Sequence, residues 1–368
     1  MGQTLGRGIL FAMRRRRVLL LFGGQSAEHD VSRVTAVAVA RALDPGQYEV
    51  VPVGITTEGQ WLLAGDAQHM LAAGRDALPA AFDVAGDAVP VPSAGARDRL
   101  DVDVVIPLLH GPYGEDGTVQ GLLELAGLPY VGSGVLGSAI GMDKIAMKRM
   151  FVAAGLEVGP YRVLRAGHDI EAFCALAERE LGMPCFVKPS NMGSSVGVRK
   201  TRDVAELRLA VEHALSFDEW VLAEQMVHGR EIEVGVLGDD PPVASLPGEI
   251  VPAADFYDYA DKYEDGKAQL LAPAPISALQ IAAVQQLAVD AFEACRCEAM
   301  ARVDFFLRDD GTFVVNELNT IPGFTPISMY PRLWEVSGLS YPELLDRLIE
   351  LAIARGERRS SRRGRQRR

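Results

Sequence analysis

Acidic side chains near the end of the chain lie on a predicted hairpin, where they could bind a metal ion. The segment 301–319 has apolar stretches on both sides of an Asp-Gly pair, a dipeptide typical of hairpin turns. Folding about that turn places Asp304 opposite Asn316 or Glu317. Asn319 shares a face with Glu317 because side chains alternate along a strand.

Two carboxylates and one amide form a set of oxygen donors that suits Mg²⁺, which keeps water ligands and takes phosphate oxygens from a substrate. A solvent-facing hairpin edge could show the same residues. The flanking Val, Phe and Leu residues favour the metal site, because polar groups inside an apolar layer need partners.

A loop rich in Gly and Ser follows another predicted strand and could bind phosphate. Lys188 ends the strand, and the loop after it contains Ser194 and Ser195. Backbone N–H groups of such a loop can surround phosphate oxygens, and the Lys would add a positive charge. The GxxxxGK[ST] pattern of a P-loop is absent, and a Gly-rich hairpin turn accounts for this segment equally well.

Carboxylates near other strand ends could bind the remaining parts of a nucleotide or a small substrate. Glu224 ends one predicted strand and Glu231 begins the next, so one could hold an adenine amino group and the other the ribose hydroxyls. Two exposed loop carboxylates would look the same. Residues 23–32 join the first strand to the first helix, where α/β sheets bind ligands. We expect Asp30 to cap this helix, which leaves Glu28 as a candidate ligand-binding residue.

A long irregular stretch near residue 260 predicts a lid. The segment 256–263 contains three Tyr residues, and it also contains Lys262. Long loops inside a compact domain usually have a function. Aromatic and basic side chains favour a loop that closes over a site and excludes water.

Elements of two kinds must position these residues. The first third alternates strands and helices, which predicts a parallel sheet; the strands are 18–22, 48–55, 102–109 and 129–131, and the helices are 31–43 and 117–126. Between residues 61 and 101 we expect irregular surface structure. From residue 142 the pattern is α+β; the helices are 143–154, 170–181, 204–215 and 277–295, and the strands are 158–164, 185–188, 220–224, 231–237 and 243–250. Irregular chain is expected up to Leu271, and two short helices should follow the hairpin.

Composition limits the class of protein. The chain has 368 residues, 48% hydrophobic content and a formal net charge of -12, which argues against nucleic acid or an anionic membrane as a partner of the folded body. The run 355–368 holds eight Arg and one Glu, and we expect it to be a disordered, solvated tail. An RNA or acidic-partner contact of this tail is the alternative.

Two further patterns concern compartment and redox state. The basic-then-apolar start resembles a signal peptide, but its apolar run ends after five residues, so we predict a buried strand and a cytoplasmic protein. We predict that residues 1–12 form a disordered extension, with Met13 as an alternative start. The four Cys residues form no CxxC pair and are expected to be reduced and buried.

The motifs taken together resemble the D-alanine–D-alanine ligase family. The pattern GGxSxE lies near the N-terminus, HGxxGEDGxxQG at 110–121, MDK at 142–144 and KPxxxGSSVG at 188–197. YDYxxKY follows at 257–263, RxDF at 302–305 and NExNxxPGFT at 316–325. Each motif alone is weak, but all seven in family order over nearly the whole chain are specific.

The resemblance implies a fold and a division of the chain. An N-terminal α/β substrate-binding domain would span 13–138, followed by a two-subdomain ATP-grasp fold. The central subdomain would span 139–230, and the C-terminal subdomain with metal site and lid 231–354.

The resemblance also implies roles for individual residues in ligating two D-alanines through a D-alanyl phosphate. ATP would be bound by Lys144, Lys188, Ser195, Glu224, Gln225, Val227, Glu231 and Lys262. Catalysis would involve Glu28, Ser194, Tyr263, Arg302 and the backbone of Gly323. Substrate would also contact His110 and Ser328. Two Mg²⁺, replaceable by Mn²⁺, would bind Asp304, Glu317 and Asn319.

Two competing hypotheses remain at this stage. Another ATP-grasp carboxylate–amine ligase, including one that uses D-lactate or D-serine as second substrate, would share most of these motifs. A catalytically silent nucleotide-binding scaffold would be expected to lack a metal ligand or Arg302, and none is missing. The family also implies a homodimer and a role in peptidoglycan precursor synthesis.

Overall fold

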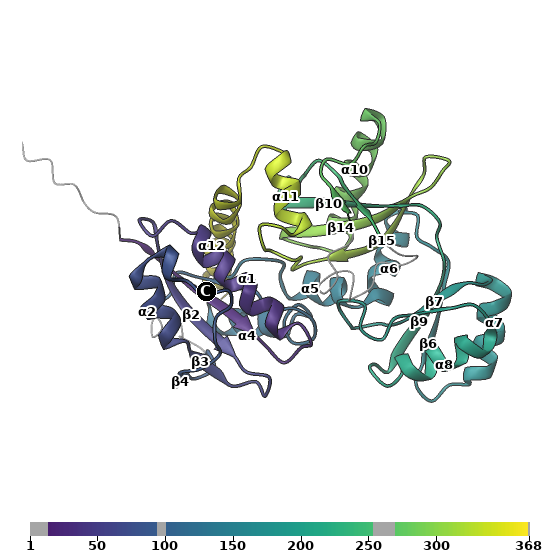
Figure 1. Ribbon diagram of the computed structural model, residues 1–368, viewed down its shortest axis with the longest axis horizontal. Coiled ribbons are helices and arrows are strands. Elements are labelled where there is room, and N and C mark those ends of the chain that lie inside the picture. The colour runs from purple at the N-terminus through teal and green to yellow at the C-terminus, as the bar shows by residue number, and fades with distance from the viewer. Residues whose placement is uncertain (1–13, 94–100, 253–268, 367–368) are drawn as a thin grey trace, which may run out of the picture.

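The chain folds around three β-sheets. The computed structural model describes residues 14–93, 101–252 and 269–366. In Figure 1 the N-terminal sheet lies on one side, the sheet of β6, β7 and β9 on the other, and the sheet of β10, β14 and β15 between them. The predicted lid, 256–263, lies outside the described residues, and so do the first twelve residues.

The first sheet is mainly parallel, as predicted. Its order is β4-β3-β2-β1-β5, in which β1 (Arg16–Gly23), β2 (Tyr48–Ile55) and β5 (Val104–Pro107) run parallel. Most of β1 is fully buried, which explains its continuous apolar run. The helices α1 (His29–Ala42) and α4 (Thr118–Ala126) follow the predicted ranges closely.

Two predictions in this domain are wrong. The segment expected to be irregular contains β3 (Trp61–Leu63), α2 (Gly65–Ala73), a short 3-10 turn (Arg75–Ala77) and β4 (Asp87–Ala88). These elements are too short to show a clear hydrophobic period. Asp30 does not cap α1: it lies in the first turn and pairs with Arg33 at 2.8 Å, while Glu28 occupies the cap position without a side-chain capping bond.

The second sheet is antiparallel, with the order β6-β9-β7-β8. Its strands are β6 (Tyr161–Arg165), β9 (Trp220–Gln225), β7 (Cys185–Pro189) and β8 (Arg199–Thr201). The helices α7 (Ile170–Leu181) and α8 (Val204–Ala214) pack on it and bury a separate apolar core. The strand β8 was not predicted. The other elements agree with the predicted ranges to within a few residues.

The third sheet has the order β13-β12-β10-β14-β15. Along this order lie β13 (Gln269–Leu271), β12 (Gly248–Val251), β10 (Arg230–Gly238), β14 (Ala299–Leu307) and β15 (Phe313–Asn319). A sixth short strand, β11 (Val243–Ala244), pairs with β10 outside this order. The helices α6 (Lys144–Ala153) and α10 (Ala278–Ala294) contribute to its core. The predicted hairpin is confirmed, but the strand expected at 243–250 is two strands, β11 and β12, separated by Pro247, which cannot donate a ladder bond. The helix α5 (Val135–Met142) was not predicted.

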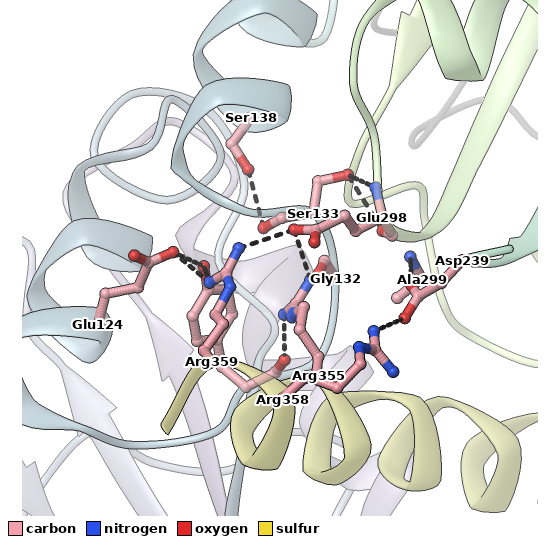
Figure 2. Close-up of polar contacts among 11 residues, drawn as sticks. Glu124, Gly132, Ser133, Ser138, Asp239, Glu298, Ala299, Arg355, Arg358 and Arg359 are labelled. Atoms are coloured by element: carbon pink, nitrogen blue, oxygen red, sulfur yellow. Dashed lines mark hydrogen bonds and ion pairs between the residues drawn. The ribbon is translucent and has the colours of Figure 1, made fainter. Parts of the chain in front are cut away.

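The predicted disordered tail is the largest correction. After α11 (Met329–Val336), one helix, α12 (Tyr341–Gln366), extends through most of the Arg-rich run. Arg355 is only 3% exposed, and Arg358 and Arg359 form ion pairs with acidic residues of distant segments (Figure 2). Arg is a good helix former, and its charge is compensated here by partners that only the tertiary fold supplies.

Two smaller expectations can be compared with the structure. All four Cys residues are buried and free, as predicted. Over the described residues, no helix has both the length and the apolar character needed to cross a membrane.

Candidate active site

The hairpin of β14 and β15 brings the predicted metal ligands together. Asp304 pairs in register with Glu317, one of the two partners predicted, and Arg302 pairs with Asn319. A register irregularity follows Asp304, where the two strands lose their regular pairing. The amide nitrogen of Asn319 donates to Asp304 Oδ2 at 3.0 Å.

Arg302 holds the centre of this cluster. Its Nε and Nη2 atoms each donate to one oxygen of Asp304 at 2.7 Å, and Nε lies 3.2 Å from Glu233 Oε1. Burial alone would lower the pKa of Arg302, but the charges of Asp304 and Glu233 raise it well above its ordinary value. The guanidinium is therefore permanently charged and held by a two-pronged contact of fixed geometry.

The donor set fits a divalent cation. Glu233, Asp304 and Glu317 lie side by side in register on three adjacent strands, with Asn319 two residues beyond Glu317. Within the described ranges, no group of three or more His, Cys, Asp or Glu side chains already has the arrangement of a metal site. The predicted set combines two carboxylates with an amide, which matches the preference of Mg²⁺ for few protein ligands.

Glu224 lies between two buried lysines. Its Oε1 is 2.7 Å from Lys148 Nζ and its Oε2 is 2.6 Å from Lys188 Nζ. Burial would raise the pKa of Glu224, but the two ammonium groups outweigh it and lower the pKa to about 2. Lys188 is affected in the opposite direction: burial would lower its pKa, and the charges of Glu224 and Glu317 raise it.

The Gly- and Ser-rich loop lies over a third lysine. Lys144 Nζ donates to the carbonyl of Met192 at 2.6 Å, and burial lowers the pKa of Lys144 against the opposing charge of Glu317. Ser194 and Ser195 both have left-handed backbone conformations, with φ of 48° and 59°. Such conformations are uncommon outside glycine and give the loop a tight curvature.

The N-terminal domain contributes two carboxylates to the other side of this loop. A Cβ atom at Gly193 would lie 3.4 Å from Glu28 Oε2 and 3.5 Å from Glu115 Oε1. Burial of its carboxyl group, followed by the charge of Glu28, raises the pKa of Glu115 to about 8, although part of its side chain reaches solvent. Nearby in sequence, His110 is 6% exposed, and its Nε2 has no hydrogen-bond partner among the described residues.

The loop after β15 holds Gly323 and Ser328, two further residues of the predicted site. The Ser328 hydroxyl contacts the Thr325 hydroxyl at 2.7 Å and accepts from the Thr325 backbone N–H at 3.2 Å. A Cβ at Gly323 would lie 3.2 Å from Ser328 Oγ, so these two residues face each other. Ser328 precedes α11 without capping it through its side chain, which keeps the hydroxyl directed at the loop.

Comparison with known proteins decides the family. A family model described as "D-ala D-ala ligase N-terminus" matches residues 17–133, and one described as "D-ala D-ala ligase C-terminus" matches residues 150–350. The chain belongs to the D-alanine–D-alanine ligase family. Membership implies the use of ATP and a divalent metal ion.

Individual relatives agree with this placement. The protein named D-alanine–D-alanine ligase from Streptomyces griseus is 49% identical over 93% of this chain and 94% of its own length. The protein of that name from Geobacillus kaustophilus is 46% identical over 94% of this chain and 97% of its own length. The solved D-alanine–D-alanine ligase from Coxiella burnetii matches with a TM-score of 0.78 at 36% identity, over 94% of this chain and 96% of its own. The VanG D-Ala:D-Ser ligase from Enterococcus faecalis has the same TM-score at 33% identity, over 92% of this chain and 100% of its own. The ATP-grasp fold is thereby established.

The remaining family positions are distributed around this centre. Gln225 directs its side-chain amide to the carbonyl of Leu181 at 3.0 Å, away from Glu224. Val227 is half-buried. Glu231 is the second residue of β10, and its charge contributes to raising the pKa of Lys188. Lys262 and Tyr263 lie outside the described residues.

Sequence reasoning missed three residues that lie beside the predicted site residues of this ligase-family fold. Lys148 is one helical turn beyond Lys144 on α6, and this i,i+4 spacing was the available signal. Glu115 lies inside the quoted HGxxGEDGxxQG motif, but its closeness to Glu28 depends on two separate loops. Glu233 stands two residues after Glu231 and so shares its face of β10.

Proposed function

We propose that this chain joins two molecules of D-alanine to D-alanyl-D-alanine at the expense of ATP, supplying peptidoglycan precursor synthesis. One observation carries the proposal: Arg302, Asp304 and Asn319 are in direct contact on one hairpin, with Glu317 opposite Asp304. This arrangement provides positive charge and metal-binding oxygens at one place. An amine can attack a carboxylate only after the carboxylate has been activated by phosphorylation. Positive charge and metal ions promote that phosphoryl transfer.

The first step transfers the γ-phosphoryl group of ATP to the carboxylate of the first D-alanine. A carboxylate oxygen forms a bond to phosphorus, the bond to the β-phosphate oxygen breaks, and ADP leaves. Lys144 and Lys188 lie close enough to the Ser194–Ser195 loop to spread the phosphoryl charge. Glu28 is placed to hold the ammonium group of this D-alanine.

The second step is the attack of the second D-alanine's amine on the acyl phosphate. A C–N bond forms and the carbonyl becomes a tetrahedral oxyanion. The carbonyl then reforms as the C–O bond to phosphate breaks, and the departing phosphate can take up the proton that the amine nitrogen loses. Arg302 and the backbone N–H of Gly323 stabilise the oxyanion. Ser328, held by Thr325, is placed to bind the second substrate's carboxylate.

Asp304, Glu317 and Asn319 would hold two Mg²⁺, for which Mn²⁺ could substitute. When bound, these ions neutralise charge on the ATP phosphates. Arg302 already neutralises Asp304, which keeps the hairpin in position before nucleotide binds.

The adenosine part of ATP would lie along β9 and β10. Because the Glu224 carboxylate is occupied by Lys148 and Lys188, we propose that adenine contacts the backbone around Gln225 and Val227. Glu231 would accept the ribose hydroxyls. Lys262 would approach the transferred phosphate, and Tyr263 would approach the first D-alanine in a hydrogen-bond network with Ser194. Both residues lie outside the described residues.

We further propose a cytoplasmic homodimer in which the domains divide near residues 138 and 230. His110, buried with an unpartnered Nε2, is proposed to face the substrate. Sedimentation velocity tests the dimer directly, since a protein of 39.7 kDa per chain should sediment as about twice that mass.

Phosphate release from ATP with Mg²⁺ tests the activity. D-alanine, L-alanine, and D-alanine with D-lactate or D-serine are compared, and products are identified by mass. D-alanine alone should give the dipeptide. Asp304→Asn should reduce turnover by at least about 100-fold, as for loss of transition-state charge stabilisation, whereas Asp310→Asn in the exposed turn of the same hairpin should not. Folded protein that binds ATP but gives no D-alanine-dependent turnover would show that the assignment is wrong.

A further inference from the structure

The Arg-rich end of α12 connects two sheets that each contribute to the active site. Arg355 and Arg359 contact Glu124 and Tyr130 on one side and Glu298 on the other (Figure 2). We call these five residues the arginine clasp. None of them belongs to the motifs that indicated the family.

Arg355 is the buried half of the clasp. Its Nη1 and Nη2 atoms donate to the carbonyls of Gly132 and Tyr130 at 2.6 Å each, and Nη1 also donates to Glu298 Oε2 at 3.2 Å. Its guanidinium carbon lies 4.6 Å from the centre of the Tyr130 ring. A buried cation with this many partners is held in one orientation.

Arg359, one helical turn later, makes the second half. Its Nη1 donates to Glu124 Oε1, and its Nη2 donates to Glu298 Oε2 at 3.0 Å. A Cβ at Gly134 would lie 2.8 Å from Arg359 Nη2. Glycine at this position therefore allows the guanidinium its close approach to the backbone.

Arg358 adds a parallel contact on the next face of the helix. It donates to Asp239 Oδ2 at 2.5 Å, and Asp239 Oδ1 accepts from the backbone N–H of Ala299 at 3.0 Å. Glu298 therefore bonds directly to arginines of α12, and Ala299 is linked to α12 through Asp239. Ala299 is the first residue of β14 and has a left-handed φ of 64°.

Each side of the clasp leads along the chain to catalytic groups. From Ala299, β14 reaches Arg302 within three residues. On the other side, Tyr130 bridges Val105 of β5, and β5 pairs with β1, whose end leads to Glu28. The clasp therefore connects the sheet that carries Glu28 to the strand that carries Arg302.

Apolar packing by itself does not specify this relative placement. One core cluster contains Leu20 and Ile106 of the first sheet, Met300 of β14 and Leu345 of α12. Burial of apolar surface is non-directional, so it holds the layers together without defining their offset. Guanidinium bonds to carbonyls and carboxylates have defined directions.

We propose that the arginine clasp is a positioning device for ligation: it sets the distance between the D-alanine site of the N-terminal domain and the Arg302 hairpin. Arg355 and Arg359 act through the elements they hold and do not touch substrate. The inference rests on the proposed function for its kinetic consequence, but its structural consequence can be measured without turnover.

Arg359→Gln is the main variant, because Arg359 is half-exposed and its replacement should leave the protein folded. Arg359→Lys keeps the charge without the planar fork, and Arg355→Lys tests the buried half. Arg362→Gln, exposed on the same helix, is the matched control for loss of one positive charge.

The kinetic readout separates positioning from general stabilisation. Arg359→Gln should raise the KM for D-alanine and lower kcat, each by about threefold to tenfold, the range for losing one or two half-exposed charged bonds. The dissociation constant of a non-hydrolysable ATP analogue should stay within twofold, because the nucleotide would lie between β9 and β10, away from the N-terminal sheet whose position the clasp sets. Arg359→Lys should recover part of the loss, and Arg362→Gln should match wild type.

Hydrogen exchange supplies the readout that does not need turnover. Arg359→Gln should speed exchange of backbone amides in 131–138 and 299–302, while β9 stays unchanged. If exchange and kinetics of Arg359→Gln match the Arg362→Gln control, or if affinity for the ATP analogue falls as much as that for D-alanine, the positioning proposal is wrong. If wild-type protein does not turn over D-alanine, the proposed function fails, and the exchange data alone then decide whether the clasp joins the two sheets.

Discussion

The ion pairs of Glu224 with Lys148 and Lys188 predict that Lys148→Met has opposite effects on stability in two backgrounds. It should lower the free energy of unfolding of the wild-type protein and raise that of the Glu224→Gln variant. Lys148 is 3% exposed, Glu224 is 5% exposed, and each lysine lies within 2.7 Å of one carboxylate oxygen. Lys148→Met leaves a charge-balanced pair of Glu224 and Lys188. Glu224→Gln leaves two buried ammonium groups facing a neutral amide.

The magnitudes follow from these charges. The pKa of Glu224 falls from its usual 4.5 to about 2, which at ~1.36 kcal/mol per pKa unit corresponds to about 3 kcal/mol of net stabilisation of the ionised form. Removing one partner of a buried pair costs a similar amount, roughly 3–5 kcal/mol. We therefore expect Glu224→Gln to lower the free energy of unfolding by about 3 kcal/mol or more, and Lys148→Met by roughly 1–3 kcal/mol.

The sign reversal appears in the double variant. In the Glu224→Gln background, Lys148→Met removes one of two repelling, unpaired cations, so it should raise the free energy of unfolding. The pH dependence has a defined direction too. Because the folded-state pKa of Glu224 lies below its usual value, the stabilisation is present above pH 4.5 and is lost as pH falls towards about 2.

Urea unfolding followed by circular dichroism and by tryptophan fluorescence would measure these changes for wild type, both single variants and the double variant. Agreement of the two probes establishes that each midpoint describes one transition. Leu279→Ala, at a site 85% exposed, controls for a substitution without buried charge. If Lys148→Met destabilises the protein equally in both backgrounds, the two lysines do not share Glu224, and the reasoning is refuted.

Three other predictions concern the active site. Glu115 has a pKa raised to about 8, so its contribution to stability is present below pH 4.5 and lost as pH rises through about 8. The melting temperature should therefore fall over this range, and Glu115→Gln should flatten the slope; an unchanged slope would contradict the prediction. Chelation of divalent ions with EDTA should abolish turnover but leave the melting temperature nearly unchanged, because the Arg302–Asp304 contact neutralises the hairpin without metal; unfolding upon chelation would contradict this. Ser328→Ala should raise the KM for the second D-alanine by about tenfold to 100-fold, the effect of losing one hydrogen bond to a charged carboxylate, and an unchanged KM would remove Ser328 from that subsite.

Local patterns in the sequence predicted most elements of the fold. The hairpin at 301–319 combines a turn dipeptide with apolar alternation, so its strands followed from local chemistry. The same pattern left Asn316 and Glu317 as alternative partners of Asp304, and the structure selects Glu317. The range of β2 was predicted to the residue because its apolar run is buried and bounded by turn residues. The elements between residues 61 and 101 were missed because they are short, and short elements show too little periodicity.

The sequence by itself determined the family, the parallel sheet of the first third, the α+β pattern that follows it, and the group of residues that could bind ATP and metal. These properties depend on residue type and on spacing within one segment. Only the tertiary structure decided which charges meet: Glu224 with Lys148, Glu115 with Glu28, and the C-terminal arginines with Glu124 and Glu298. From the sequence alone the Arg-rich run is predicted to be a solvated tail. In the structure it forms the end of α12, where Arg355 is buried and Arg358 and Arg359 form ion pairs with acidic residues. The free energy of a charged side chain depends on the groups around it in space, and the spacing of residues along the chain does not contain that information.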